Sequence, residues 1–164
     1  MTRVYVGFGS NVDRDRHIRA GVGLVAKSFG KLLLSSVYES PAYGFEGDNF
    51  YNLVAGFDTD LELPALAAKL REIEYNCGRQ RQEGRFLPRT VDIDLLLYGD
   101  LVRHDDEFDL PRADIVLFAF VLYPLAEIAA GGTHPELGRT YAGLWRDFTG
   151  DKRQIRPVSF SFAC

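Results

Sequence analysis

The chain has 164 residues, of which 46% are hydrophobic and 26% charged, and its formal net charge is -4. This length and balance are ordinary for a globular protein, and we expect residues 1–164 to form one domain. The negative net charge provides no general attraction to nucleic acid or to an anionic membrane, so we expect neither as a partner.

Hydrophobic periodicity predicts the elements in chain order. They are a strand at 3–8, a helix at 14–29, strands at 32–39 and 50–59, a helix at 63–77, a strand at 91–98, helical segments at 115–129 and 139–147, and a closing strand at 155–162. Asn11 or Asp13 is placed to cap the first helix, and Gly30 is placed to end it. Pro124 predicts a break in the segment 115–129.

The first six elements follow the order β-α-β-β-α-β, which is typical of a ferredoxin-like fold. We therefore expect an α+β protein with an antiparallel sheet and helices packed on one face. This fold hosts many activities, so function has to be argued from particular residues.

The segment from Arg79 to Tyr98 carries most of the chemical information. Asp92 and Asp94 alternate with apolar residues in a predicted strand, so both carboxylates should project from the same face. Two carboxylates this close repel unless a cation lies between them, and Mg²⁺ prefers carboxylate oxygens and substrate phosphates. Four arginines precede the pair and are suited to bidentate contacts with phosphate: Arg79, Arg81, Arg85 and Arg89. The combination indicates phosphoryl transfer from a nucleotide. The alternative interpretation is a solvated acidic pair beside an exposed basic face.

With these motifs placed, the chain resembles the 6-hydroxymethyl-7,8-dihydropterin pyrophosphokinases over roughly residues 3–148. The resemblance lies in ordered motifs. They are Gly7-Phe8-Gly9-Ser10-Asn11, Ser36-Val37-Tyr38-Glu39-Ser40-Pro41, Phe50-Tyr51-Asn52, Gly78-Arg79 with Arg81, Pro88-Arg89-Thr90-Val91-Asp92-Ile93-Asp94, and Phe120-Val121-Leu122 followed by Pro124-Leu125 and Glu127-Ile128.

The resemblance implies transfer of the β,γ-diphosphate of ATP to the hydroxymethyl group of 6-hydroxymethyl-7,8-dihydropterin in folate biosynthesis, with AMP as the second product. By similarity, Asp92 and Asp94 would hold two Mg²⁺ ions, and Arg79 and Arg89 would complete the catalytic set. The nucleotide would contact a further group of residues: Glu74, Arg81, Arg85 and Arg112.

The resemblance also implies a pterin site. Phe120 would stack on the ring with Phe50 nearby, and Asn52 would bond to the ring edge. The loop containing Ser40, Pro41 and Tyr43 would add backbone contacts. Judged on residue type alone, Phe50 and Phe120 are more often core residues, and Ser10 and Asn11 are more often turn or cap residues.

The departures from the family pattern cluster on the nucleotide side. Arg112 stands where the family typically has His, Phe118 stands where it has Arg, and Leu87 replaces a small residue. Two alternatives therefore stay open: a divergent paralogue that acts on another hydroxymethylpterin, or a protein that binds pterin without turnover. An RNA-binding domain fits poorly, because the chain is acidic and lacks paired exposed aromatics in basic motifs.

The two cysteines, Cys77 and Cys164, provide neither a disulfide framework nor a metal-ligand spacing. The N-terminus shows no charged-then-apolar leader, and no apolar run approaches the roughly 20 residues that span a bilayer. We therefore expect a cytoplasmic monomer that acts on small molecules.

Overall fold

The computed structural model describes residues 1–42, 47–82 and 90–162, apart from the side chains of 78–82 and 153. Within these residues, six strands form one antiparallel sheet in the order β5-β1-β4-β3-β8, with β2 beside β4. The strands are β1 (Thr2–Ser10), β2 (Leu33–Leu34), β3 (Val37–Ser40), β4 (Phe50–Thr59), β5 (Asp92–Tyr98) and β8 (Arg156–Val158). A separate hairpin pairs β6 (Arg103–His104) with β7 (Asp109–Leu110).

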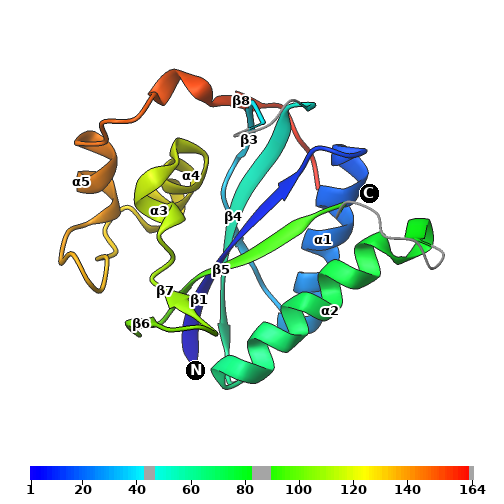
Figure 1. The fold of residues 1–164 in the computed structure, drawn as a ribbon, viewed down its shortest axis with the longest axis horizontal. Coiled ribbons are helices and arrows are strands. Elements are labelled where there is room, and N and C mark those ends of the chain that lie inside the picture. Colours follow the sequence, from blue (N-terminus) through cyan, green and yellow to red (C-terminus); the bar gives the residue numbers. More distant parts are fainter. Residues whose placement is uncertain (43–46, 83–89, 163–164) are drawn as a thin grey trace.

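The two long helices, α1 (Arg14–Phe29) and α2 (Leu63–Gln82), cover one face of the sheet, as predicted (Figure 1). Alternation along β1 explains this packing, because Val4, Val6 and Phe8 project into the core with α1 and α2. Tyr5 projects from the other side of the strand and packs against a second core cluster.

The opposite face is covered by three shorter helices, α3 (Asp114–Leu117), α4 (Ala119–Ala129) and α5 (Tyr141–Arg146) (Figure 1). The sheet contributes Val54 and Leu96 to this second core, and α4 contributes Leu122 and Leu125. Residues from the C-terminal third of the chain therefore form the roof over this face. No helix in the described ranges has the length and apolarity needed to cross a membrane.

In the first half of the chain, the strand expected at 3–8 extends from Thr2 to Ser10, and two further elements differ from the prediction. The strand expected at 32–39 is divided into β2 and β3, because the Ser35 hydroxyl replaces a carbonyl as the acceptor for the Val54 N–H (2.9 Å). The helix expected to end at residue 77 continues to Gln82, so Arg79 and Arg81 lie in α2 and not in a loop. Arginine and glutamine are good helix formers, which explains the extension beyond Gly78.

The break expected at Pro124 was also misplaced. Phe118 has an extended backbone that separates α3 from α4, whereas Pro124 lies buried inside α4. Burial of the apolar face of α4 in the second core outweighs the single backbone hydrogen bond that proline removes. Gly30 ends α1 at φ 89, as predicted, and Asp13 is the N-cap residue but makes no side-chain capping bond.

Candidate active site

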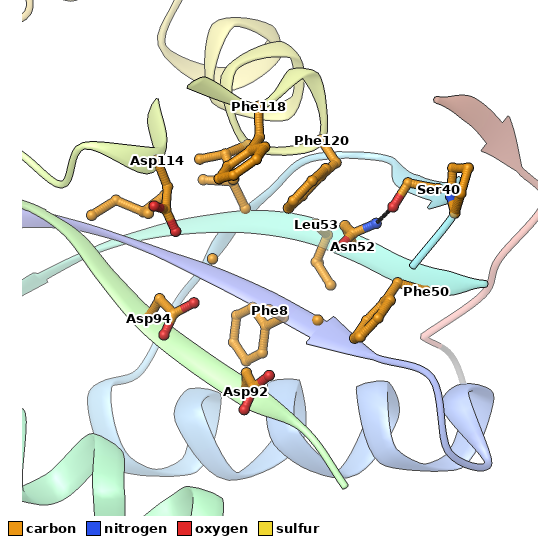
Figure 2. A pocket seen from close by; sticks show the side chains of 16 residues that line it. Phe8, Ser40, Phe50, Asn52, Leu53, Asp92, Asp94, Asp114, Phe118 and Phe120 are labelled. Carbon is orange, nitrogen blue, oxygen red and sulfur yellow. Dashed lines mark hydrogen bonds between the residues drawn. The ribbon is translucent and has the colours of Figure 1, made fainter. Parts of the chain in front are cut away.

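A cavity of about 260 Å³ lies between the sheet and the helices α3 and α4. Strands β1, β4 and β5 form its floor, and Phe118, Phe120 and Val121 close it from above. Figure 2 shows the side chains: the carboxylates of Asp92, Asp94 and Asp114 lie at one end, and Phe50, Asn52 and Ser40 lie at the other. The cavity thus has an acidic end and an aromatic, amide-bearing end.

Two glycines of β1 make the floor of this cavity flat. Gly9 pairs with Asn52 on one side and Asp92 on the other, and Gly7 pairs in the same way with Val54 and Asp94. A methyl group at Gly9 would stand 3.4 Å from Asn52 Oδ1 and 3.7 Å from Phe50 Cδ2. Glycine inside a strand often marks a place where a ligand approaches the backbone closely.

The acidic end is built by the alternation of β5. Asp92 and Asp94 face the cavity, whereas Ile93 and Leu95 pack on the side of α1 and α2, as predicted. Glu74 of α2 holds the start of β5 from the helix side of the sheet, because its Oε2 accepts a hydrogen bond from the Ile93 N–H (2.7 Å). The two carboxylates therefore project from a rigid strand rather than from a loop.

This donor set fits magnesium held jointly by protein and substrate. Among the described residues, no three His, Cys, Asp or Glu side chains form a group that could enclose an ion. Mg²⁺ is commonly bound by one or two carboxylates together with substrate phosphates, and the paired aspartates match that pattern.

The aromatic end presents ring faces and an amide. Phe118 and Phe120 are stacked, with centroids 5.0 Å apart and an interplanar angle of 19°. Asn52 is buried, and its amide nitrogen donates to Ser40 Oγ (2.8 Å), so its orientation on β4 is fixed. Phe50 is the residue at the start of the same strand. The arrangement provides apolar faces with a polar edge, which is typical of sites for flat heterocycles.

A second, smaller cavity of about 120 Å³ lies against the other edge of β5. Its lining includes several charged side chains: Arg71, Glu74, Asp94, Glu107, Asp109 and Arg112. Asp94 lines both cavities, so its carboxylate stands at the boundary between them. The two cavities therefore meet at one acidic group.

The guanidinium of Arg112 lies between two carboxylates of the larger cavity, those of Asp94 and Asp114. Its Nη2 lies 3.8 Å from Asp94 Oδ1, and its Nε donates to Asp114 Oδ2 (3.2 Å). Burial lowers the pKa of this guanidinium, but the charges of Asp94 and Asp114 outweigh burial, and the pKa lies above its ordinary value.

Two sets of polar contacts hold the strands that carry the site. Ser10 Oγ donates a short hydrogen bond to the carbonyl of Thr90, which joins the end of β1 to the residue two before Asp92. Glu39, beside Ser40 on β3, is paired with Arg156 of β8 and with Arg14 (2.7 Å). The hydrogen bond from Arg156, followed by that from Arg14, holds the pKa of Glu39 below its ordinary value despite burial.

The structure brings together most of the predicted residues that it describes. The first cavity is lined by seven of them: Ser40, Pro41, Phe50, Asn52, Asp92, Asp94 and Phe120. Glu74 and Arg112 line the second cavity. Arg79 and Arg81 lie in α2, but their side chains are outside the described set, and Tyr43, Arg85 and Arg89 lie outside the described residues altogether.

Sequence reasoning missed Gly7, Gly9, Asp114 and the positioning contact of Ser10. The two glycines carried a detectable signal, since Gly7 lies in the strand predicted at 3–8 and Gly9 follows it with the same alternation. Asp114 carried none, because its proximity to Asp94 depends on how the chain folds between residues 94 and 114.

Comparisons with known proteins agree with this geometry. A family model described as 7,8-dihydro-6-hydroxymethylpterin-pyrophosphokinase (HPPK) matches residues 5–130. A protein of Aquifex aeolicus named 2-amino-4-hydroxy-6-hydroxymethyldihydropteridine pyrophosphokinase is 36% identical over 137 residues, which cover 82% of this chain and 85% of the relative. A protein of the same name from Methylorubrum extorquens is 38% identical over 133 residues, covering 79% and 84%.

Among solved structures, the wild-type HPPK-DHPS of Plasmodium falciparum matches with a TM-score of 0.71 at 14% identity. The match covers 90% of this chain but only 43% of the Plasmodium chain, so this chain spans less than half of that protein. At this identity the likeness concerns the fold alone.

Proposed function

This chain belongs to the 7,8-dihydro-6-hydroxymethylpterin-pyrophosphokinase family, and we propose that it transfers the β,γ-diphosphate of ATP to the hydroxymethyl group of 6-hydroxymethyl-7,8-dihydropterin in folate biosynthesis. The hydroxymethyl oxygen releases its proton to solvent and forms a bond to the β-phosphorus, the bond from that phosphorus to the α,β-bridging oxygen breaks, and AMP leaves. The observation that carries the proposal is the position of Asp94 between an aromatic cavity and a charged one.

The acceptor occupies the larger cavity in this proposal. Its ring lies over Gly7 and Gly9, beneath Phe120 and beside Phe50, with its polar edge towards Asn52 and Ser40. This orientation directs the hydroxymethyl group towards the acidic end, because the amide and the carboxylates lie at opposite ends of the cavity (Figure 2). The stacked rings exclude water from one face of the ligand and hold its reacting oxygen in place.

The nucleotide occupies the charged cavity beyond β5. Arg112 is positioned to contact the transferred phosphates, and Glu74 lies where it can accept hydrogen bonds from the nucleoside. The proposed phosphate contacts further include Arg79, Arg81, Arg85 and Arg89. Magnesium held by Asp92 and Asp94 would neutralise phosphate charge and align the β-phosphorus with the attacking oxygen.

The experiment that tests this role compares neutral isosteres of the acidic pair with a distant control. Asp92→Asn and Asp94→Asn should lower pterin-dependent AMP formation at least about 1000-fold, which corresponds to about 4 kcal/mol of transition-state stabilisation. Pterin binding, measured by fluorescence, should stay within about threefold of wild type, because both substitutions keep the shape of the cavity.

Asp60→Asn is the matched control, because Asp60 is 79% exposed and lies at the end of β4 away from both cavities. It should keep full turnover. Turnover above about a tenth of wild type in both Asp92→Asn and Asp94→Asn would exclude the proposed role of the pair.

A further inference from the structure

The contact between Arg112 and Asp94 places a fixed cation beside a carboxylate that the proposed function needs for a metal. The two groups are each partly exposed, at 35% and 41%, and their nearest atoms lie 3.8 Å apart. Arginine keeps its proton at any pH at which the protein is folded, so this charge can be removed only by movement of the side chain.

The backbone of Arg112 is anchored by hydrogen bonds, and its side chain is held by ion pairs. The Arg112 N–H donates to the carbonyl of Leu96 (3.0 Å), and the Arg112 carbonyl accepts from the N–H of Ile115 (3.1 Å). The guanidinium is held between Asp94 of β5 and Asp114 at the start of α3. Asp114 therefore provides a second anionic contact that the side chain can keep when it leaves Asp94.

Charge decides what happens when a metal–nucleotide complex arrives. A divalent ion on Asp94 would lie close to the guanidinium, and the two cations repel each other. The phosphates that arrive with the ion offer paired oxygens, which match the planar fork of arginine better than the single loose contact with Asp94. Movement of the Arg112 side chain away from Asp94 is therefore unfavourable when the metal ion binds alone, and favourable when the ion binds together with phosphates.

We propose that Arg112 gates the metal site: in the free enzyme its guanidinium competes with a divalent cation for Asp94, and it moves onto the nucleotide phosphates when metal and nucleotide bind together. Asp114 is the positioning residue that keeps the guanidinium within reach of both places. The inference rests on the proposed function for the identity of the nucleotide site. This movement of Arg112 makes metal binding and nucleotide binding strongly cooperative, because each ligand favours the side-chain position that the other requires.

The test measures Mn²⁺ binding to the full-length protein by electron paramagnetic resonance, with and without α,β-methylene-ATP, whose α,β bond cannot be cleaved. Arg112→Gln should bind Mn²⁺ alone about tenfold more tightly than wild type, the scale expected for removing a unit charge about 4 Å from a carboxylate. The same variant should bind the Mn²⁺–nucleotide complex about tenfold more weakly. A residue with a merely structural role would not shift the two affinities in opposite directions.

A second variant separates charge from geometry. Arg112→Lys keeps the positive charge, so its affinity for Mn²⁺ alone should stay within about threefold of wild type, while the loss of the fork weakens the nucleotide complex. Arg3→Gln is the matched control, since Arg3 is 47% exposed, pairs with Asp58, and neither residue lines either cavity. It should change neither affinity.

Unchanged or weaker binding of Mn²⁺ alone by Arg112→Gln would overturn the gate, even if pterin-dependent AMP formation is found. Opposite shifts in a protein that forms no AMP would support the gate and reject the proposed function. The two hypotheses can therefore fail separately.

Discussion

Replacing Gly9 by alanine tests whether the flat floor of the larger cavity is a ligand surface. The added methyl group has room in the ligand-free protein, because its nearest described neighbours would lie 3.4 Å away at Asn52 Oδ1 and 3.7 Å away at Phe50 Cδ2. Glycine inside a strand is less favourable than alanine by about 0.5–1 kcal/mol, so the free energy of unfolding should stay equal or rise by up to about 1 kcal/mol.

The same methyl group stands where the ring of the pterin has to lie. Forcing an extra methyl into a packed contact costs about 1–3 kcal/mol, which raises the dissociation constant of the pterin about 5- to 150-fold. Nucleotide binding should change by less than about twofold, because Gly9 does not line the charged cavity.

The assay combines thermal unfolding, pterin titration by fluorescence and the KM for each substrate. Gly23→Ala is the control: it is the same substitution at an exposed position of α1, where the methyl group would meet no described atom within 4 Å. It should stabilise the helix by up to about 1 kcal/mol and leave both KM values unchanged. Unaltered pterin affinity in Gly9→Ala would refute the placement of the ring over this floor.

Three further predictions concern the contacts around the site. Asn52→Ala removes the buried 2.8 Å hydrogen bond to Ser40 Oγ, so the free energy of unfolding should fall by about 1–3 kcal/mol and the KM for the pterin should rise at least about tenfold. An unchanged KM would contradict a hydrogen bond between the Asn52 amide and the edge of the pterin ring. Pairing with Arg156 and Arg14 holds the pKa of Glu39 below its ordinary value of 4.5, so this pairing stabilises the fold above that pH and the stabilisation is lost as pH falls through the folded pKa. The difference in unfolding temperature between wild type and Glu39→Gln should shrink only below about pH 4.5, and a constant difference down to about pH 2 contradicts the pairing. The hydrogen bond to Asp109, followed by that to Glu136, raises the pKa of His104 above 6.5, so the stabilisation of the fold by this pairing is complete below that pH and lost as pH rises through the folded pKa. The unfolding temperature of wild type should exceed that of His104→Gln at about pH 5.5 and equal it at about pH 9, and equal temperatures at both pH values refute the pairing.

The local parts of this architecture could be read from the sequence because they depend on short-range periodicity. The alternation of Asp92 and Asp94 with Ile93 places the carboxylates on one face of a strand, and the helical spacing of Ile18, Val22 and Val25 places α1. Both features involve neighbours a few residues apart, and both were predicted correctly.

Features that depend on distant contacts were not predictable in this way. The division between β2 and β3 comes from a bond between Ser35 and Val54, and the break at Phe118 comes from packing on the second core. The placement of Asp114 beside Arg112 and Asp94 likewise follows from the return of the chain over the sheet. The roles of Tyr43, Arg85 and Arg89 stay predictions, since these residues lie outside the described ranges.

The central claim is that a diphosphate group moves as a unit from the nucleotide to the hydroxymethyl oxygen of the pterin. The most direct measurement is phosphorus nuclear magnetic resonance of the products formed from ATP, Mg²⁺ and 6-hydroxymethyl-7,8-dihydropterin. The account predicts AMP and a pterin that carries two linked phosphates, in equal amounts, with neither formed when the pterin is omitted. ADP with a singly phosphorylated pterin, or AMP formed without the pterin, would contradict it.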